Sequence, residues 1–167
     1  MEPRKATTPE RRQQIADEKK IRQSPELLGL DDQTYQQFLL YYQCPPIDLL
    51  TGEDDPALPL VTCDADNPLK YVLGPAFLDN THVISAEAGS DPQGVGYVVT
   101  LTFDSWGSKV WADFTAANVQ RQAALVFNTL VISAPNINEP ITGGSVQISG
   151  TFDRAEAEHL ADQIAGR

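Results

Sequence analysis

The chain has 167 residues, 41% of them hydrophobic, and a formal net charge of −11 at neutral pH. This length and composition predict one compact folded domain with a loosely attached end, and they exclude a disordered chain. Residues 1–23 hold seven basic and four acidic residues (+3), whereas residues 24–167 hold five and nineteen (−14), so the acidic body should repel phosphates and we expect no nucleic-acid partner.

The N-terminal end and the hydropathy of the chain bear on its relation to membranes. No apolar run of about 18 residues occurs, and the N-terminal MEPRKATTPERR is polar, so the sequence predicts neither a membrane span nor a signal peptide. If the parent protein is secreted or embedded in a membrane, we expect this chain to be a soluble excised piece of it.

Two helices are predicted before residue 44. Thr8-Pro9-Glu10 is a helix start of the N-cap and proline kind, and the helix after it has only Ile15 and Ile21 as apolar anchors, so we expect it to be solvated. The second helix begins at Asp31 or Asp32, and its apolar side chains share one face that should dock on the body. That face comprises Tyr35, Phe38, Leu39 and Tyr42.

Cys44 and Cys63 flank a proline-rich, acidic segment. A disulfide between them would remove about 3 kcal/mol of unfolded-chain entropy in the simple loop model, so we predict this bond and, with it, an oxidising, extracytoplasmic setting. The alternative is two buried thiols in a reducing compartment. With two cysteines and no histidine nearby, we expect no zinc site. From Cys44 to about Pro68, the density of Pro, Asp and Gly predicts a stapled loop rather than regular elements.

A strand and a helix are predicted in the middle of the chain. YVVTLTF, residues 97–103, alternates apolar and polar side chains, as in an antiparallel strand covered on one face. Asp104 or Ser105 can cap the helix that follows, and the apolar stripe of this helix should lie on the sheet. The stripe comprises Gly107, Val110, Phe114 and Ala117.

A hairpin and a final helix complete the predicted fold. Asn128-Thr129 joins two apolar strands, but Thr is β-branched and resists positive φ, so this turn is either strained or differently wound. Asp153 and Glu156 form a variant of the capping box at the start of the last helix. We therefore predict an α+β fold, an antiparallel sheet with helices packed on one face, plus a helical and loop extension over residues 1–68 before a head domain over residues 69–167.

The search for chemistry yields no catalytic constellation. Nothing in the sequence places an acid or a nucleophile beside His82 or His159, and the serines lack the context of a nucleophile elbow. The acidic pairs Asp54-Asp55 and Asp64-x-Asp66 lack the bidentate Glu of a calcium loop. We therefore expect no enzymatic activity, no metal and no cofactor.

Trp106 and Trp111 are five residues apart on the predicted middle helix. They cannot both lie in a narrow apolar stripe, so one should have an exposed edge. That ring either packs against a neighbouring loop or contacts another protein chain.

The segment VISAPNINEPITGGSVQISGTF, residues 131–152, closely resembles a motif near the end of the first large extracytoplasmic domain of the SecD family. This family is the accessory membrane subunit of the bacterial Sec export machinery. YVLGPAFL, VVTLTFDSWGSKVWADFTAAN and DRAEAEHLADQIAG resemble the neighbouring segments of the same head domain. The resemblance covers residues 71–166. The family usually has an Asp-Gly type of turn where this chain has Asn128-Thr129, and its motif has no counterpart to residues 1–68.

The resemblance implies a function for the whole domain. The head would contact an unfolded preprotein that emerges from the SecYEG channel, together with SecF, and proton flow through the membrane part would drive its movement. The parent protein would then be membrane-embedded, with this piece on the extracytoplasmic side of the plasma membrane. A docking module for other translocon subunits or chaperones, reached through the acidic surface or the N-terminal segment, is the alternative.

The motif itself suggests where a polypeptide would bind. Its two prolines withhold ladder hydrogen bonds and its Gly-Gly pair turns the chain back, so we expect a rigid loop that protrudes between two strands. An alternative of equal weight is that the two flanking segments are core strands joined by a demanding turn. The candidate polypeptide-binding residues are Trp106, Trp111, Asn136, Ile137, Pro140 and Ile141.

Overall fold

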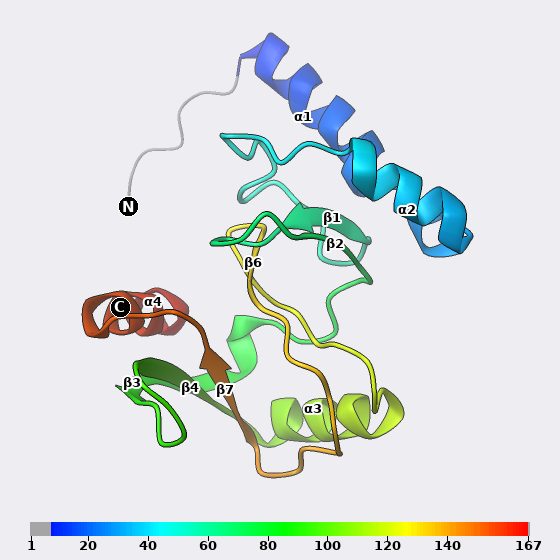
Figure 1. Ribbon diagram of the computed structural model, residues 1–167. Coiled ribbons are helices and arrows are strands. Elements are labelled where there is room, and N and C mark those ends of the chain that lie inside the picture. Colours follow the sequence, from blue (N-terminus) through cyan, green and yellow to red (C-terminus); the bar gives the residue numbers. More distant parts are fainter. Residues whose placement is uncertain (1–7, 167) are drawn as a thin grey trace. The chain divides into compact units, whose positions relative to one another are not determined.

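The computed structural model describes residues 8–166, and these divide into two units (Figure 1). The first unit comprises the described residues up to Ala76 together with Val126–Val131. The second comprises Phe77–Leu125 and the described residues from Ile132 onward. Within residues 8–166, no helix is both long and apolar enough to span a bilayer.

The first unit begins with α1 (Pro9–Arg22). The predicted cap is confirmed, because the Thr8 side chain accepts a hydrogen bond from the Arg11 N–H at 3.2 Å. Ile15 is buried, whereas Ile21 is 53% exposed, so one of the two expected anchors holds the helix. A 3-10 helix, η1 (Pro25–Gly29), follows.

The helix α2 (Asp32–Tyr41) is capped by Asp31, as predicted, but it buries none of its residues. The predicted face is nevertheless the inner one, because Tyr35, Phe38, Leu39 and Tyr42 are half-buried while the rest of the helix is exposed. Phe38 stacks on Tyr42 within that face, with ring centroids 6.1 Å apart, so the aromatic rings cover one another. The helix is held near its C-terminus, where the Lys70 ammonium donates a 2.8 Å hydrogen bond to the Leu39 carbonyl.

The segment between the cysteines is less irregular than predicted. It contains β1 (Leu60–Cys63), which pairs antiparallel with β2 (Lys70–Leu73). All four residues of β1 are buried, because LVTC is a short apolar, β-branched run despite the surrounding prolines. The predicted hairpin is present as β5 (Leu125–Phe127) and β6 (Leu130–Ser133), and its tip belongs to the first unit.

The second unit is built on a three-stranded antiparallel sheet with the order β3-β4-β7. Its strands are β3 (Val83–Ser90), β4 (Tyr97–Phe103) and β7 (Ser145–Ser149). The predicted alternation of β4 is confirmed, since Val99, Leu101 and Phe103 lie in one core cluster while Thr100 and Thr102 do not. The short 3-10 helix η2 (Asn80–His82) precedes β3.

The helix α4 (Arg154–Ala165) packs on this sheet with Ala157, Leu160 and Ala161 buried. Its capping box is confirmed: Asp153 accepts from the Glu156 N–H, and the Glu156 carboxylate accepts from the Asp153 N–H. The predicted α+β class is therefore confirmed.

The helix α3 (Ser105–Ala117) is capped by Asp104, but its buried residues are Gly107, Trp111 and Thr115. The predicted stripe is right in part: Gly107 is buried and Phe114 packs on the core, but Val110 is half-buried and Ala117 is exposed. The Trp111 ring packs between Phe77 and Phe103, at centroid distances of 6.1 and 5.9 Å, so the face of the helix that carries Trp111 lies against the core.

Candidate functional site

The loop between β6 and β7 does not protrude freely, so the structure favours the alternative of core strands joined by a demanding turn over a protruding loop. It runs antiparallel beside residues 120–123, where Ile137 donates to the Arg121 carbonyl and accepts from the Gln120 N–H, both at 2.8 Å. Ala123 also donates to the Pro135 carbonyl at 3.1 Å. Pairing on this side compensates for the missing proline donors and fixes the loop on the second unit.

The candidate binding residues of this loop differ in exposure. Ile137 is 2% exposed and belongs to the core of the second unit, so its side chain presents no surface. Asn136 and Pro140 are exposed, and Ile141 is half-buried. The Ile141 N–H donates to the Thr115 hydroxyl at 2.9 Å, which ties the loop to α3.

The Gly-Gly pair turns the loop into β7, as predicted. Gly144 has φ +70°, and a Cβ placed on it would lie 2.9 Å from the Ser108 hydroxyl. The Gly144 carbonyl accepts from the Phe103 N–H at 2.9 Å. Glycine is therefore required at this position both by the backbone conformation and by the close approach of α3.

The two tryptophans have opposite environments, which confirms that only one could lie fully inside. Trp111 is 5% exposed, whereas Trp106 is 53% exposed. The Trp106 ring packs on the His82 imidazole, with centroids 4.2 Å apart. Trp106 therefore offers an aromatic surface that is backed on one side and open on the other.

His82 has a partner that the sequence analysis missed. Its Nδ1 lies 2.9 Å from Asp104 Oδ2, and the hydrogen bond from the Gly107 N–H, together with this contact, lowers the pKa of Asp104. Val83 and Phe103 face each other in the β3–β4 ladder, so His82 and Asp104 are the next positions along the two strands. Because β3 was not among the strands predicted from the sequence, this pairing could not be found there. His159, by contrast, is exposed on α4.

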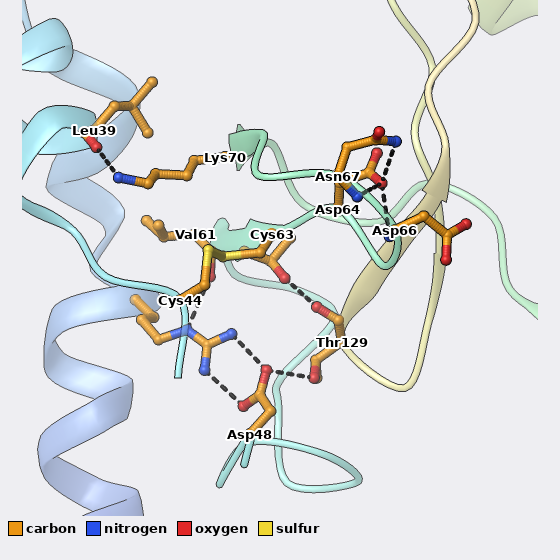
Figure 2. Close-up of a disulfide and its surroundings, with 12 residues drawn as sticks. Leu39, Cys44, Asp48, Val61, Cys63, Asp64, Asp66, Asn67, Lys70 and Thr129 are labelled. Atoms are coloured by element: carbon orange, nitrogen blue, oxygen red, sulfur yellow. Dashed lines mark hydrogen bonds and ion pairs between the residues drawn. A yellow bond between two sulfur atoms is a disulfide. The ribbon is translucent and has the colours of Figure 1, made fainter. Parts of the chain in front are cut away.

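The predicted disulfide joins Cys44 and Cys63, whose Cα atoms are 6.1 Å apart, and it closes the loop that carries Asp48 (Figure 2). Asp64 lies just beyond the bridge. Its carboxylate accepts from the N–H groups of Asp66 and Asn67 at 3.0 and 2.9 Å, so this acidic pair shapes a turn. Among residues 8–166, no group of three or more His, Cys, Asp or Glu is placed to hold a metal ion.

A buried arginine, also missed from the sequence, organises the first unit. Arg22 is 0% exposed, and its guanidinium donates to both carboxylate oxygens of Asp48 at 2.6 and 2.8 Å and to the Val61 carbonyl at 2.9 Å. Burial opposes its charge, but the hydrogen bonds and charge of Asp48 outweigh this effect and raise the pKa of Arg22. Burial likewise opposes ionisation of Asp48, yet the hydrogen bonds from Arg22 and Thr129 lower its pKa.

Asp48 also holds the tip of the β5–β6 hairpin (Figure 2). The Thr129 hydroxyl donates to Asp48 Oδ2 at 2.7 Å, and the Thr62 hydroxyl donates to the Thr129 carbonyl. Asn128 and Thr129 have φ of +49° and +66°, so the turn has the positive-φ pair of a type I′ hairpin. These side-chain hydrogen bonds explain how a β-branched residue is kept in the left-handed region.

The comparisons with known proteins identify the family. The model of the SecDF P1 head subdomain matches residues 59–166. The chain belongs to this SecDF family. A SecD protein translocase subunit from Mycobacterium tuberculosis (strain CDC 1551 / Oshkosh) is 41% identical over 158 residues, which cover 91% of this chain and 26% of the relative. The SecD subunit of Acidaminococcus fermentans is 41% identical over 114 residues, or 67% of this chain and 27% of the relative.

A solved structure of SecDF, described as a membrane component that enhances protein export, is also similar. It is 33% identical with a TM-score of 0.53, over 56% of this chain and 42% of that chain. This chain spans about a quarter of the length of the SecD relatives from M. tuberculosis and A. fermentans. Because the M. tuberculosis match covers 91% of this chain, it extends well into residues 1–68, whereas the SecDF match is shorter. The expectation that residues 1–68 have no counterpart in the family is therefore wrong.

Proposed function

We propose that this chain is the extracytoplasmic head of a SecD subunit and that it contacts unfolded preproteins during proton-driven export, without enzymatic activity of its own. The match of residues 59–166 to the SecDF head carries this proposal. The Cys44–Cys63 disulfide supports an oxidising location on the outer side of the plasma membrane. SecF and the SecYEG channel would be the partners of the whole subunit.

Trp106 is the best placed of the candidate contact residues. A surface that captures many unfolded sequences needs an apolar contact that does not depend on one side-chain pattern, and an exposed indole supplies it. The His82 ring behind it restrains the indole, which lowers the entropy lost on binding. Asn136, Pro140 and Ile141 would extend the contact, while the buried Trp111 and Ile137 would support it from within.

Substitution of Trp106 by Ala tests this site. We expect it to reduce crosslinking of an unfolded secretory protein to the chain at least fivefold, because an anchor aromatic at an interface contributes about 1–2 kcal/mol or more. Val95→Ala is the matched control, since Val95 is fully exposed in the loop between β3 and β4. If Trp106→Ala crosslinks as well as Val95→Ala does, the contact lies elsewhere on the chain.

A second candidate function is a docking module for other translocon subunits or chaperones, and the N-terminal helices favour it. Leu40 and Tyr41 of α2 are 70% and 79% exposed, and a groove of about 610 Å³ runs between α1 and α2. The groove is lined by Glu18, Ile21, Thr34, Gln37, Phe38, Tyr41, Tyr42 and Gln43.

The salt dependence of binding separates preprotein capture from docking through the acidic surface, and a variant of Tyr41 tests docking on the groove. Docking through the acidic surface should weaken steeply between low and physiological ionic strength, whereas apolar capture of an unfolded chain should not. Tyr41→Ser should weaken docking and leave preprotein crosslinking unchanged. Loss of crosslinking in Tyr41→Ser would instead place the preprotein on the N-terminal helices.

A further inference from the structure

We propose that the Cys44–Cys63 disulfide is a reducible lock on the hairpin tip Val126–Val131, which a dithiol reductant opens. This role goes beyond preprotein contact. It concerns residues of the first unit alone, because both cysteines and the tip belong to that unit. The lock therefore does not depend on how the two units are placed.

The two groups that hold the tip come from opposite ends of the loop that the disulfide closes. Asp48, four residues after Cys44, accepts from the Thr129 hydroxyl at 2.7 Å. Thr62, directly before Cys63, donates to the Thr129 carbonyl. Two ties hold these two ends together: the bridge, and Arg22, which binds both Asp48 and the Val61 carbonyl beside Thr62. Opening the bridge leaves Arg22 as the remaining tie, so the hydrogen bonds on Thr129 break more often but are not abolished.

The tip needs this restraint because its conformation is unfavourable by itself. Thr129 has φ +66°, in the left-handed region that a β-branched residue avoids. Thr129 is nevertheless 3% exposed, so the surrounding side chains enforce the turn. When either hold is lost, the backbone strain favours opening of the tip rather than of the regular strands around it.

The disulfide is accessible to a thiol reductant. Cys44 is exposed, Cys63 is buried, and a cavity of about 180 Å³ beside the bond is lined by both cysteines together with Asp64 and Leu130. One thiolate of the dithiol attacks Sγ of Cys44, the S–S bond breaks, and the electron pair leaves on Sγ of Cys63, which then takes up a proton. The second thiolate attacks the mixed disulfide, the Cys44 thiolate leaves and is protonated, and the reductant becomes a cyclic disulfide.

Other contacts keep the first unit folded after reduction. The Arg22–Asp48 pair remains, and Gln23 still exchanges two hydrogen bonds with the backbone of Asp55, at 2.9 and 3.0 Å. Leu50 stays in the cluster that it forms with Ile15 and Leu60. Reduction should therefore loosen the tip without unfolding the unit around it.

The residues of the lock lie on both sides of the point where the match to the SecDF head begins. Cys63, Thr62 and the tip lie within residues 59–166, which match the SecDF head, whereas Cys44, Asp48 and Arg22 lie before them. The N-terminal segment thus adds a thiol-sensitive restraint to a hairpin of the family head. The chain continues from the tip into the second unit on both sides, at Leu125 and Ile132.

Amide hydrogen exchange on the full chain, measured by NMR before and after treatment with dithiothreitol, tests the lock. We expect exchange of the Val126–Val131 amides to rise about tenfold, which corresponds to about 1.4 kcal/mol, the scale of one hydrogen bond on Thr129. The amides of Val99 and Leu101 in β4 are the internal control and should not change. The variant Cys44→Ser/Cys63→Ser should show the reduced pattern without dithiothreitol.

Three results would overturn the proposal. Unchanged exchange at the tip after complete reduction would mean that the bridge does not hold it. A parallel rise in β4 would mean that the bond staples the whole chain rather than the tip. Resistance of the folded chain to millimolar dithiothreitol would mean that the bond is a permanent staple.

Discussion

At the scale of single residues, Arg22 and Thr129 show how two unfavourable features support each other. A buried guanidinium is costly unless it is paired, and a threonine in the left-handed region is strained. Asp48 offsets both costs, since it accepts two hydrogen bonds from Arg22 and one from Thr129. Neither Arg22 nor its partner could be predicted from sequence, because 26 residues separate them and the sequence shows Arg22 only as one more cation in a basic helix.

Replacement of Arg22 by Met should destabilise the chain by about 3–5 kcal/mol, because it leaves Asp48 buried without its counter-ion. Denaturant unfolding measures the loss. The double variant Arg22→Met/Asp48→Leu should be less destabilised than the single variant, since it removes both charges. Lys20→Met is the control, because the Lys20 side chain is 76% exposed in its ion pair with Asp17. An equal effect of Arg22→Met and Lys20→Met would refute the buried pair.

The same network predicts a pH dependence of stability. The pKa of Asp48 is lower in the folded chain than its usual value of about 3.9, so its ionised form stabilises the fold above that value. This contribution is lost as the pH falls below about 4 and through the folded-state pKa. Unfolding free energies measured from pH 7 to pH 3 should fall less steeply in Asp48→Asn than in the parent chain. Parallel curves would show that Asp48 does not contribute.

At the scale of elements, local sequence signals predicted the helix caps correctly, whereas the packing of whole helices and loops was harder to predict. Thr8, Asp31 and Asp153 cap helices where the sequence placed them, because a cap depends on three or four neighbouring residues. The orientation of α3 was predicted only in part, since it follows from where the Trp111 ring finds space among Phe77 and Phe103. The sequence left open whether the β6–β7 segment protrudes or joins core strands by a turn, because its pairing with residues 120–123 is a long-range contact that composition does not reveal.

The turn into β7 makes a further prediction at this scale. Gly144→Ala should cost about 1–2 kcal/mol for the left-handed backbone alone, with an added cost for the clash with Ser108. In the double variant Gly144→Ala/Ser108→Ala, the clash should be relieved and the backbone cost should remain. Gly143→Ala is the matched control, because no atom lies within 4 Å of the Cβ position there. Thermal unfolding of the variants tests both parts. Equal melting temperatures for the Gly144 and Gly143 variants would contradict the backbone cost, and equal ones for Gly144→Ala and the double variant would contradict the close approach.

At the scale of the whole molecule, the chain combines a family head with a segment that precedes it. The sequence suggested a boundary near residue 68, and this boundary stays a prediction; the hairpin tip groups with the first unit, although it lies some 60 residues later in the chain. The order of residues in the chain cannot reveal this grouping, because the two residues that bind the tip, Asp48 and Thr62, carry no distinctive sequence signal. The family itself was recognisable from a long motif, and the match over residues 59–166 confirms it.

The central claim is that the chain contacts unfolded polypeptides in transit. Fluorescence anisotropy of a labelled, unfolded secretory protein, titrated with the full chain at low and at physiological salt, tests it most directly, with the folded form of the same protein as control. We predict saturable binding of the unfolded form alone, with a Kd that changes little with salt and rises in Trp106→Ala. Equal binding of folded and unfolded forms, or no binding at high micromolar concentration, would contradict it.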